Sequence, residues 1–350
     1  MSADAVGKNL SRLKAFWARE NHDRPLIGFT GGYFPSETIQ LLTVRDGQIY
    51  PDSIDIPAFL ACCDEQYSAW DWATGDLFWS AAPLWGLPWV SAILGQPLYA
   101  SSETIWTEPV LKNYDKLNEL CNLENNLWLD ALLNLGSRLA EHVQGRYPLG
   151  AISSAAPLVL LTDMRGITEF GLHLYDPPQE LEKALAKITD VYLNVFQRYF
   201  NCIPKWHGGY GSGTRFMWAP GLLVEYDEDS SYILSPEFQQ KFVMPLHRRI
   251  IDSFNFAYLH LHSSQLHTFD TLLADDRLKY FELTPDVGCD ISELIPSIQR
   301  IREQKCVIVH GYLTAEDFDL IIESMPPEGL CIISRVSGPE QANLLQDKII

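Results

Sequence analysis

The sequence contains no run of Lys or Arg and no long apolar segment, and both absences limit what the protein can bind. Lys and Arg together number 26 against 45 Asp and Glu, which gives a net charge of −19. A chain this acidic is poorly suited to the phosphates of nucleic acids or anionic lipids. The longest apolar stretches, such as residues 158–161, fall far short of the roughly 20 residues that span a bilayer. We therefore expect neither nucleic acid nor membrane as a partner.

Cysteines and the N-terminal residues give two further exclusions. The seven cysteines are an odd number and show no Cys-x-x-Cys spacing, so neither a disulfide framework nor an all-cysteine zinc site is indicated. The first residues, MSADAVGK, lack the apolar core of a secretory signal, and we expect a cytoplasmic protein. With 350 residues, of which 47% are hydrophobic, the chain can bury a large core.

Short apolar runs alternate with amphipathic stretches along the whole chain, without a linker between two halves. This pattern predicts strands that alternate with helices. The expected strands lie at residues 24–32, 149–157, 205–211, 258–264, 280–285, 306–311 and 330–335, with an eighth within 75–95. The expected helices lie at residues 6–19, 119–143, 178–201, 236–254, 291–304 and 315–324. Eight units favour an α/β fold of the (β/α)8 TIM barrel type, with residues 1–350 as a single domain.

A doubly wound open sheet is the alternative fold. It is less favoured because no Gly-x-Gly-x-x-Gly turn follows the first strand. In a barrel, catalytic residues lie at the C-terminal ends of the strands. His260, His262, Glu282 and His310 all fall at such positions.

The segment Tyr258-Leu-His-Leu-His262-Ser-Ser-Gln-Leu-His267 holds three of the nine histidines. Side chains alternate along a strand, so His260 and His262 project from the same face, as two ligands of one divalent metal would. A metal needs a third ligand as well. Without one, two neutral imidazoles satisfied within the core are the competing interpretation.

Several short motifs, in this order and spacing, resemble the uroporphyrinogen decarboxylase superfamily, which includes methylcobamide:coenzyme M methyltransferases and is related in fold to cobalamin-independent methionine synthase. The resemblance covers nearly the whole chain and implies a (β/α)8 barrel. Its carriers are Arg24-Pro with Gly31-Gly-Tyr33, Gly86-Leu-Pro-Trp, Gly150-Ala with Ala156-Pro157, Thr162-Asp-Met-Arg-Gly166, Leu234-Ser-Pro236, Phe242-Val-Met-Pro245, His260-Leu-His262 and His310-Gly-Tyr-Leu.

The departures from that family change the expected chemistry. True decarboxylases carry arginines after the first strand to hold substrate carboxylates, whereas this chain has Phe29-Thr-Gly-Gly-Tyr33 there. Authentic uroporphyrinogen decarboxylation is therefore not expected. Asp76 is the loose match for the family's catalytic aspartate, and a helix cap or turn is its other interpretation.

The zinc-dependent methyltransferases of the family have His-x-Cys on one strand, an acid on the next and a distal Cys-Gly. The resemblance places His260, His262 and Glu282 at the first three positions, and Ser337-Gly338 at the last. Two histidines and one carboxylate can hold zinc, with iron as the alternative. Loss of both thiolates leaves more positive charge on the metal, which suits polarisation of oxygen or activation of water, so methylation of a thiol is less strongly indicated than in the family. His310 is expected to be a fourth ligand or a general base.

The remaining candidates concern the substrate. Arg165 offers a family-matched positive charge for an anion, Asp229 lies in an acidic loop that faces the pocket in relatives, and Tyr33 is a third expected contact. The dense tryptophans at residues 70–89 could line a pocket or pack in the core.

The expected function is methyl transfer between a small substrate and a corrinoid or thiol acceptor, with the corrinoid on a separate carrier protein. A metal-free lyase or decarboxylase that uses Asp76 is one alternative, and a barrel that binds ligand without turnover is another. Homodimers are common among relatives.

Overall fold

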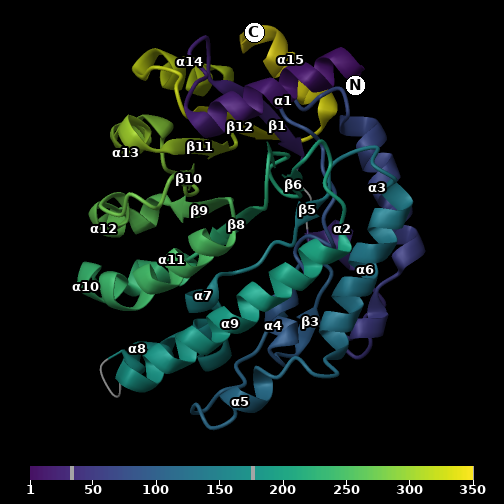
Figure 1. The fold of residues 1–350 in the computed structure, drawn as a ribbon, viewed down its shortest axis with the longest axis vertical. Coiled ribbons are helices and arrows are strands. Elements are labelled where there is room, and N and C mark those ends of the chain that lie inside the picture. Colours follow the sequence, from purple (N-terminus) through teal and green to yellow (C-terminus); the bar gives the residue numbers. More distant parts are fainter. Residues whose placement is uncertain (32–34, 175–177, 350) are drawn as a thin grey trace.

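A six-stranded parallel sheet is the main element of the computed structural model, which describes residues 1–31, 35–174 and 178–349. Its strand order is β1-β12-β11-β10-β9-β8. The bounds are β1 (Leu26–Gly31), β8 (Leu223–Asp227), β9 (Phe256–His262), β10 (Tyr280–Thr284), β11 (Cys306–Gly311) and β12 (Leu330–Val336). Figure 1 shows this sheet in the upper half of the molecule, with α1 and α10 to α15 around it, α3 and α6 along the right-hand side, and α4, α5 and α7 to α9 below. Four of these strands, β1, β9, β11 and β12, are buried along nearly their whole length.

Two small sheets complete the strands. One joins β2 (Gln48–Ile49), β3 (Leu98–Ala100) and β4 (Ile105–Thr107) in antiparallel pairs. The other joins β5 (Gly150–Ala151) to β6 (Tyr210–Ser212) in parallel, and β6 to β7 (Trp218–Ala219) in antiparallel.

Helices connect and cover the strands. Those before β6 are α1 (Ala3–Ala18), α2 (Pro35–Gln40), α3 (Ile56–Trp70), α4 (Trp89–Ile93), α5 (Leu117–Leu120), α6 (Leu127–Val143), α7 (Pro157–Arg165), α8 (Ile167–His173) and α9 (Pro178–Cys202). Those after β8 are α10 (Pro236–Phe238), α11 (Met244–Ser253), α12 (Phe269–Leu273), α13 (Ile291–Gln304), α14 (Ala315–Ser324) and α15 (Pro339–Ile349). Short 3-10 turns are η1 (Pro51–Ser53), η2 (Asp229–Ile233) and η4 (Ser263–Thr268).

The prediction of a closed eight-stranded barrel is wrong. The parallel sheet is an open half-barrel with β1 and β8 at its edges. Residues 75–95 supply only isolated bridges, Gly28 to Gly75 and Ala81 to Leu149, because Pro83, Gly86 and Pro88 interrupt any strand there. The expected strand at 149–157 is limited to two residues in β5, and Pro157 already begins α7.

The helix predicted at 236–254 begins where expected but is not regular. Ser235 caps it by accepting a hydrogen bond from the Phe238 N–H. Residues Gln239–Val243 (η3) then form a π-helical turn before α11. Pro245 has no N–H for the regular bond to the residue-241 carbonyl, which explains why the α-helical ladder is interrupted here.

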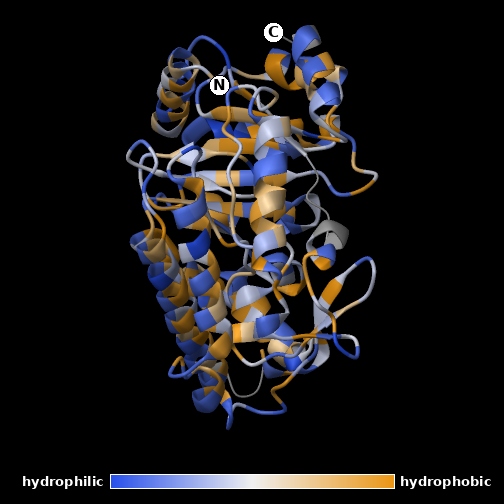
Figure 2. Ribbon diagram, turned by 90° about the vertical axis from the view of Figure 1, so that its right-hand side faces the viewer, coloured by the Kyte–Doolittle hydropathy of each residue, from blue (hydrophilic) through white to orange (hydrophobic). Residues whose placement is uncertain are grey.

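One continuous hydrophobic core joins the sheet to the helices. Figure 2 shows hydrophobic and hydrophilic residues alternating along the helices, as expected for helices with one buried face. Within the described residues, no helix has the length and apolar character needed to cross a bilayer.

Candidate functional site

Polar side chains gather on one face of the main sheet, near the C-terminal ends of its strands. His260 pairs in register with Glu282 on β10 and with Asp227 on β8. At the other end of the sheet, Thr30 on β1 pairs with Arg335 on β12. Residues in register on parallel strands point to the same face, so these side chains share one surface.

Glu282 is the centre of this cluster and is fully buried. Arg215, which follows β6, donates from Nε to Glu282 Oε1 at 2.7 Å, and its Nη2 lies 3.2 Å from Glu225 Oε1. Burial alone would raise the pKa of Glu282, but the charges of Arg215 and His260 outweigh it and hold that pKa well below its ordinary value. Glu282 is therefore a carboxylate at neutral pH.

Two imidazoles face the same carboxylate oxygen and differ in protonation. The Nδ1 atoms of His260 and His310 each lie 3.2 Å from Glu282 Oε1. Burial opposes a charge on either ring, yet Glu282 raises the pKa of His260 to about 9. At His310, burial and the nearby Arg215 lower the pKa to about 3. His310 is thus the neutral ring, and its Nε2 lies 3.4 Å from Thr30 Oγ1.

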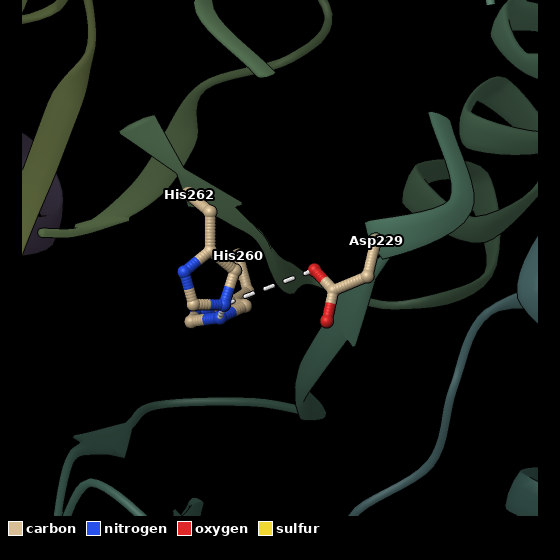
Figure 3. Close-up of side chains that lie close together, drawn as sticks. All are labelled: Asp229, His260 and His262. Atoms are coloured by element: carbon tan, nitrogen blue, oxygen red, sulfur yellow. Dashed lines mark hydrogen bonds and ion pairs between the residues drawn. The ribbon is translucent and has the colours of Figure 1, made fainter. Parts of the chain in front are cut away.

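The opposite nitrogen of His260 belongs to a second group of side chains, shown in Figure 3. His260 Nε2 is 3.1 Å from His262 Nε2, and His262 Nε2 is 4.0 Å from Asp229 Oδ1. His262 Nδ1 in turn lies 2.9 Å from Asp286 Oδ1. In each histidine, Nε2 therefore faces the space between the two rings and Asp229, while Nδ1 lies next to a carboxylate, Glu282 for His260 and Asp286 for His262.

These three donors have the spacing of a metal site. Ligand atoms at about 2.0–2.1 Å from a tetrahedral zinc ion lie about 3.3 Å apart. The potential ligand atoms of Asp229, His260 and His262 all lie within 4.8 Å of one another. A carboxylate behind each imidazole is the usual way in which proteins orient metal-binding histidines.

A second group, Glu225, His260 and Glu282, also satisfies the distance requirement for a metal. Here the Arg215 guanidinium already contacts both carboxylates. Because this cation neutralises the pair of acids, the group fits a metal less well than the first. Glu282, predicted as a ligand, contacts the side of His260 away from His262 and is better placed to orient that ring.

A cavity of about 270 Å³ lies beside the cluster. Two residues line the cavity and also belong to the cluster. Thr30 contacts His310, and Arg215 contacts Glu282. The wall also contains aromatic side chains, and these include three of the tryptophans whose density the sequence shows. These tryptophans are Trp70, Trp79 and Trp85.

The structure separates Asp76 from this cluster. Its carboxylate accepts two hydrogen bonds from Arg24, at 2.6 and 2.9 Å, and one from the Ile27 N–H at 3.0 Å. These contacts lie at the first residues of β1, whereas Thr30, near the end of that strand, faces the cluster. At about 3.3 Å per residue, the two ends are roughly 10 Å apart. The placement favours a structural ion pair.

Arg165 and Tyr33 are the other predicted substrate contacts. Arg165 is buried on α7, where it donates to the Leu111 carbonyl at 3.0 Å and lies over the Tyr114 ring. Its partners among the described residues are outside the cluster and the cavity wall. Tyr33 falls outside the described residues.

Sequence reasoning missed three charged residues of the site. Arg215 follows the glycine-rich segment at 208–213, Asp286 follows the end of β10, and Arg335 lies within β12. A position at or just after a strand end was the available signal for each.

The chain is similar to a solved structure, although its sequence matches no known family. No family model and no curated protein matches the chain. A solved structure of a methyltransferase from Methanosarcina mazei has a TM-score of 0.65 and 13% sequence identity, and the match covers 98% of each chain. At this identity the likeness shows the fold alone, so membership of the uroporphyrinogen decarboxylase superfamily stays a prediction. The chain thus shares, over nearly its whole length, the fold of a known methyltransferase.

Proposed function

We propose that the protein is a methyl-transfer enzyme with a divalent metal held by His260, His262 and Asp229. The observation that carries the proposal is the convergence of these three side chains, with Glu282 and Asp286 behind the two imidazoles. The fold shared with a methyltransferase supports the reaction class. Zinc is the expected ion, since two imidazoles and a carboxylate form one of its common ligand sets, and iron is the alternative.

The metal would act as a Lewis acid that stabilises negative charge on the methyl donor or acceptor atom. Glu282 would fix the His260 ring through Nδ1 and direct Nε2 to the metal. A metal bound at that nitrogen would displace a proton that His260 otherwise carries, so metal affinity should rise with pH. His310 remains neutral, and its Nε2 would accept a hydrogen bond from a substrate group near Thr30.

A corrinoid on a separate carrier protein is the proposed second methyl carrier, in keeping with the resemblance described above. The metal-free lyase alternative depends on Asp76, and the ion pair with Arg24 already occupies that carboxylate. Methyl transfer is therefore the better supported function.

Metal content is the first test. Protein purified without chelator or nickel affinity should contain near-stoichiometric zinc or iron by elemental analysis, and His260→Ala/His262→Ala should lose it. His142→Ala is a matched control, because the His142 side chain is 30% exposed and 2.9 Å from Asp64, as His262 is 30% exposed and 2.9 Å from Asp286. It should retain the metal.

Methyl transfer is measured on the same proteins as transfer of the methyl group from methylcobalamin to a small thiol, which yields the methyl thioether and cob(I)alamin. The metal-containing protein and His142→Ala should accelerate transfer, and the double variant should not. Native protein that contains no metal, or metal that survives in the double variant, would overturn the proposed site.

A further inference from the structure

The cavity beside the cluster has an aromatic wall and a polar end. Trp70 is contributed by α3, Trp79 and Trp85 follow it in the chain, and Phe216 comes from the segment before β7. Flat apolar surfaces of this kind favour a planar ligand over an extended polar one. A volume of about 270 Å³ is slightly below the roughly 300–1,000 Å³ typical of small-molecule sites, which limits the occupant to about one ring with short substituents.

The charge of the cavity wall is positive, although the protein as a whole is strongly acidic. The described lining residues include no Asp or Glu and two arginines, Arg215 and Arg335. Glu282 and Glu225 neutralise Arg215. Arg335 makes no ion pair with a described carboxylate, and its guanidinium lies 5.5 Å from the centre of the Tyr312 ring. Its positive charge is therefore available to a ligand.

Arg335 and the cluster are connected through the strand register. Arg335 pairs with Thr30, and Thr30 Oγ1 lies 3.4 Å from His310 Nε2. A ligand that lies against the tryptophans and contacts Arg335 would therefore also lie beside Thr30 and Arg215, at the edge of the cluster.

We propose that this cavity binds a small planar carboxylate, with an aromatic or conjugated body against Trp70 and Trp79 and its carboxylate on Arg335. A guanidinium matches a carboxylate in both charge and geometry, because two parallel N–H groups can donate to the two oxygens. The identification of this ligand as the methyl-bearing substrate rests on the proposed function. The binding of a planar carboxylate in the cavity is independent of that function.

Calorimetric titration of the native protein with benzoate, benzyl alcohol and acetate tests the two halves of the site. Benzyl alcohol keeps the ring and loses the charge, while acetate keeps the charge and loses the ring. Benzoate should bind about 10- to 100-fold more tightly than either, since a hydrogen-bonded ion pair and ring burial each contribute about a tenfold factor or more. Equal affinities for the three, or no benzoate binding, would overturn the proposal.

Variants test the assignment of the carboxylate to Arg335. Arg335→Gln should weaken benzoate binding about 10- to 100-fold and leave benzyl alcohol binding unchanged. Arg300→Gln is the matched control, because Arg300 on α13 also lies over an aromatic ring, Phe269, at 5.6 Å, but outside the cavity. Equal benzoate affinity in the two variants would refute the role of Arg335.

The same titration separates this inference from the proposed function. Benzoate binding should persist in EDTA and in His260→Ala/His262→Ala, because neither histidine lines the cavity. If the native, metal-containing protein binds benzoate but does not catalyse methyl transfer, the carboxylate site stands and the proposed enzymatic function is wrong. Loss of benzoate binding on chelation would instead place the carboxylate on the metal and contradict the Arg335 site.

Discussion

Replacing Arg215 by Met should destabilise the protein strongly, because it removes the cation between two acids in the interior. The side chains of Arg215 and Glu282 are 6% and 0% exposed, and Glu225 is 18% exposed. Removing one partner of a buried ion pair costs about 3–5 kcal/mol, since the other charge is left without compensation. Glu225 keeps hydrogen bonds from Tyr258 and Thr214, so most of the cost should arise at Glu282, where the charged His260 still offsets part of it. We therefore expect a loss of about 3 kcal/mol.

Urea unfolding at neutral pH measures this loss. Arg300→Met is the control, because it removes an arginine that pairs with Asp270 at the exposed surface, and such pairs contribute little. A double-mutant cycle with Glu282→Gln isolates the pair. Neutralising Glu282 in the Arg215→Met background should restore part of the lost stability, because the buried negative charge that Arg215 paired with is gone. Equal unfolding midpoints for Arg215→Met and Arg300→Met would refute the assignment of Glu282 as a buried carboxylate held by Arg215.

Two further predictions concern stability. Asp76→Asn should lower the unfolding free energy by about 2–3 kcal/mol, because it weakens the contacts with Arg24 and the Ile27 N–H, yet leave metal content and benzoate affinity unchanged. Altered metal content would contradict a purely structural Asp76. In Glu228→Gln, which removes the acid 3.6 Å from His247, stability should fall as the pH decreases below about 6.5. Burial lowers the pKa of His247 to about 3, so the unfolded chain takes up a proton that the folded chain does not, which costs up to about 1.4 kcal/mol per pH unit. A flat urea-unfolding profile between pH 6.5 and 4.5 would contradict this.

The pattern of strands in the sequence predicted where the histidine cluster lies, but it did not predict whether the sheet closes into a barrel. Strand periodicity placed His260 and His262 on one face, and the structure places both there with Glu282 and His310 nearby. Short apolar runs indicate strands, but they do not determine how long each strand is or whether the last one meets the first. The segment at 75–95 shows the difference, since its apolar residues are buried in loops and in α4.

The orientation of side chains could not be predicted from the sequence. His260 has two nitrogens, and which one faces Glu282 depends on ring rotation within a packed interior. Arg215 lies 67 residues from Glu282 in the chain, and its approach is fixed by how the segment after β6 crosses the end of the sheet. Local pattern contains no information about such contacts. For this reason the sequence suggested Glu282 as the third metal ligand, whereas the proposal based on the structure uses Asp229.

The degree to which each carboxylate is satisfied distinguishes a structural acid from a functional one in this molecule. Both oxygens of Asp76 accept hydrogen bonds from Arg24, and one also accepts from the Ile27 N–H, so the group is saturated by its own fold. Glu282 is different, because Arg215 and both histidines approach Oε1, while Oε2 is buried and accepts no hydrogen bond from the described residues. A buried oxygen in that state is costly and therefore calls for a specific reason. The proposed metal site supplies that reason, because an acid placed with Oε1 3.2 Å from His260 Nδ1 would orient this ring toward a metal and leave Oε2 without a partner among the described residues.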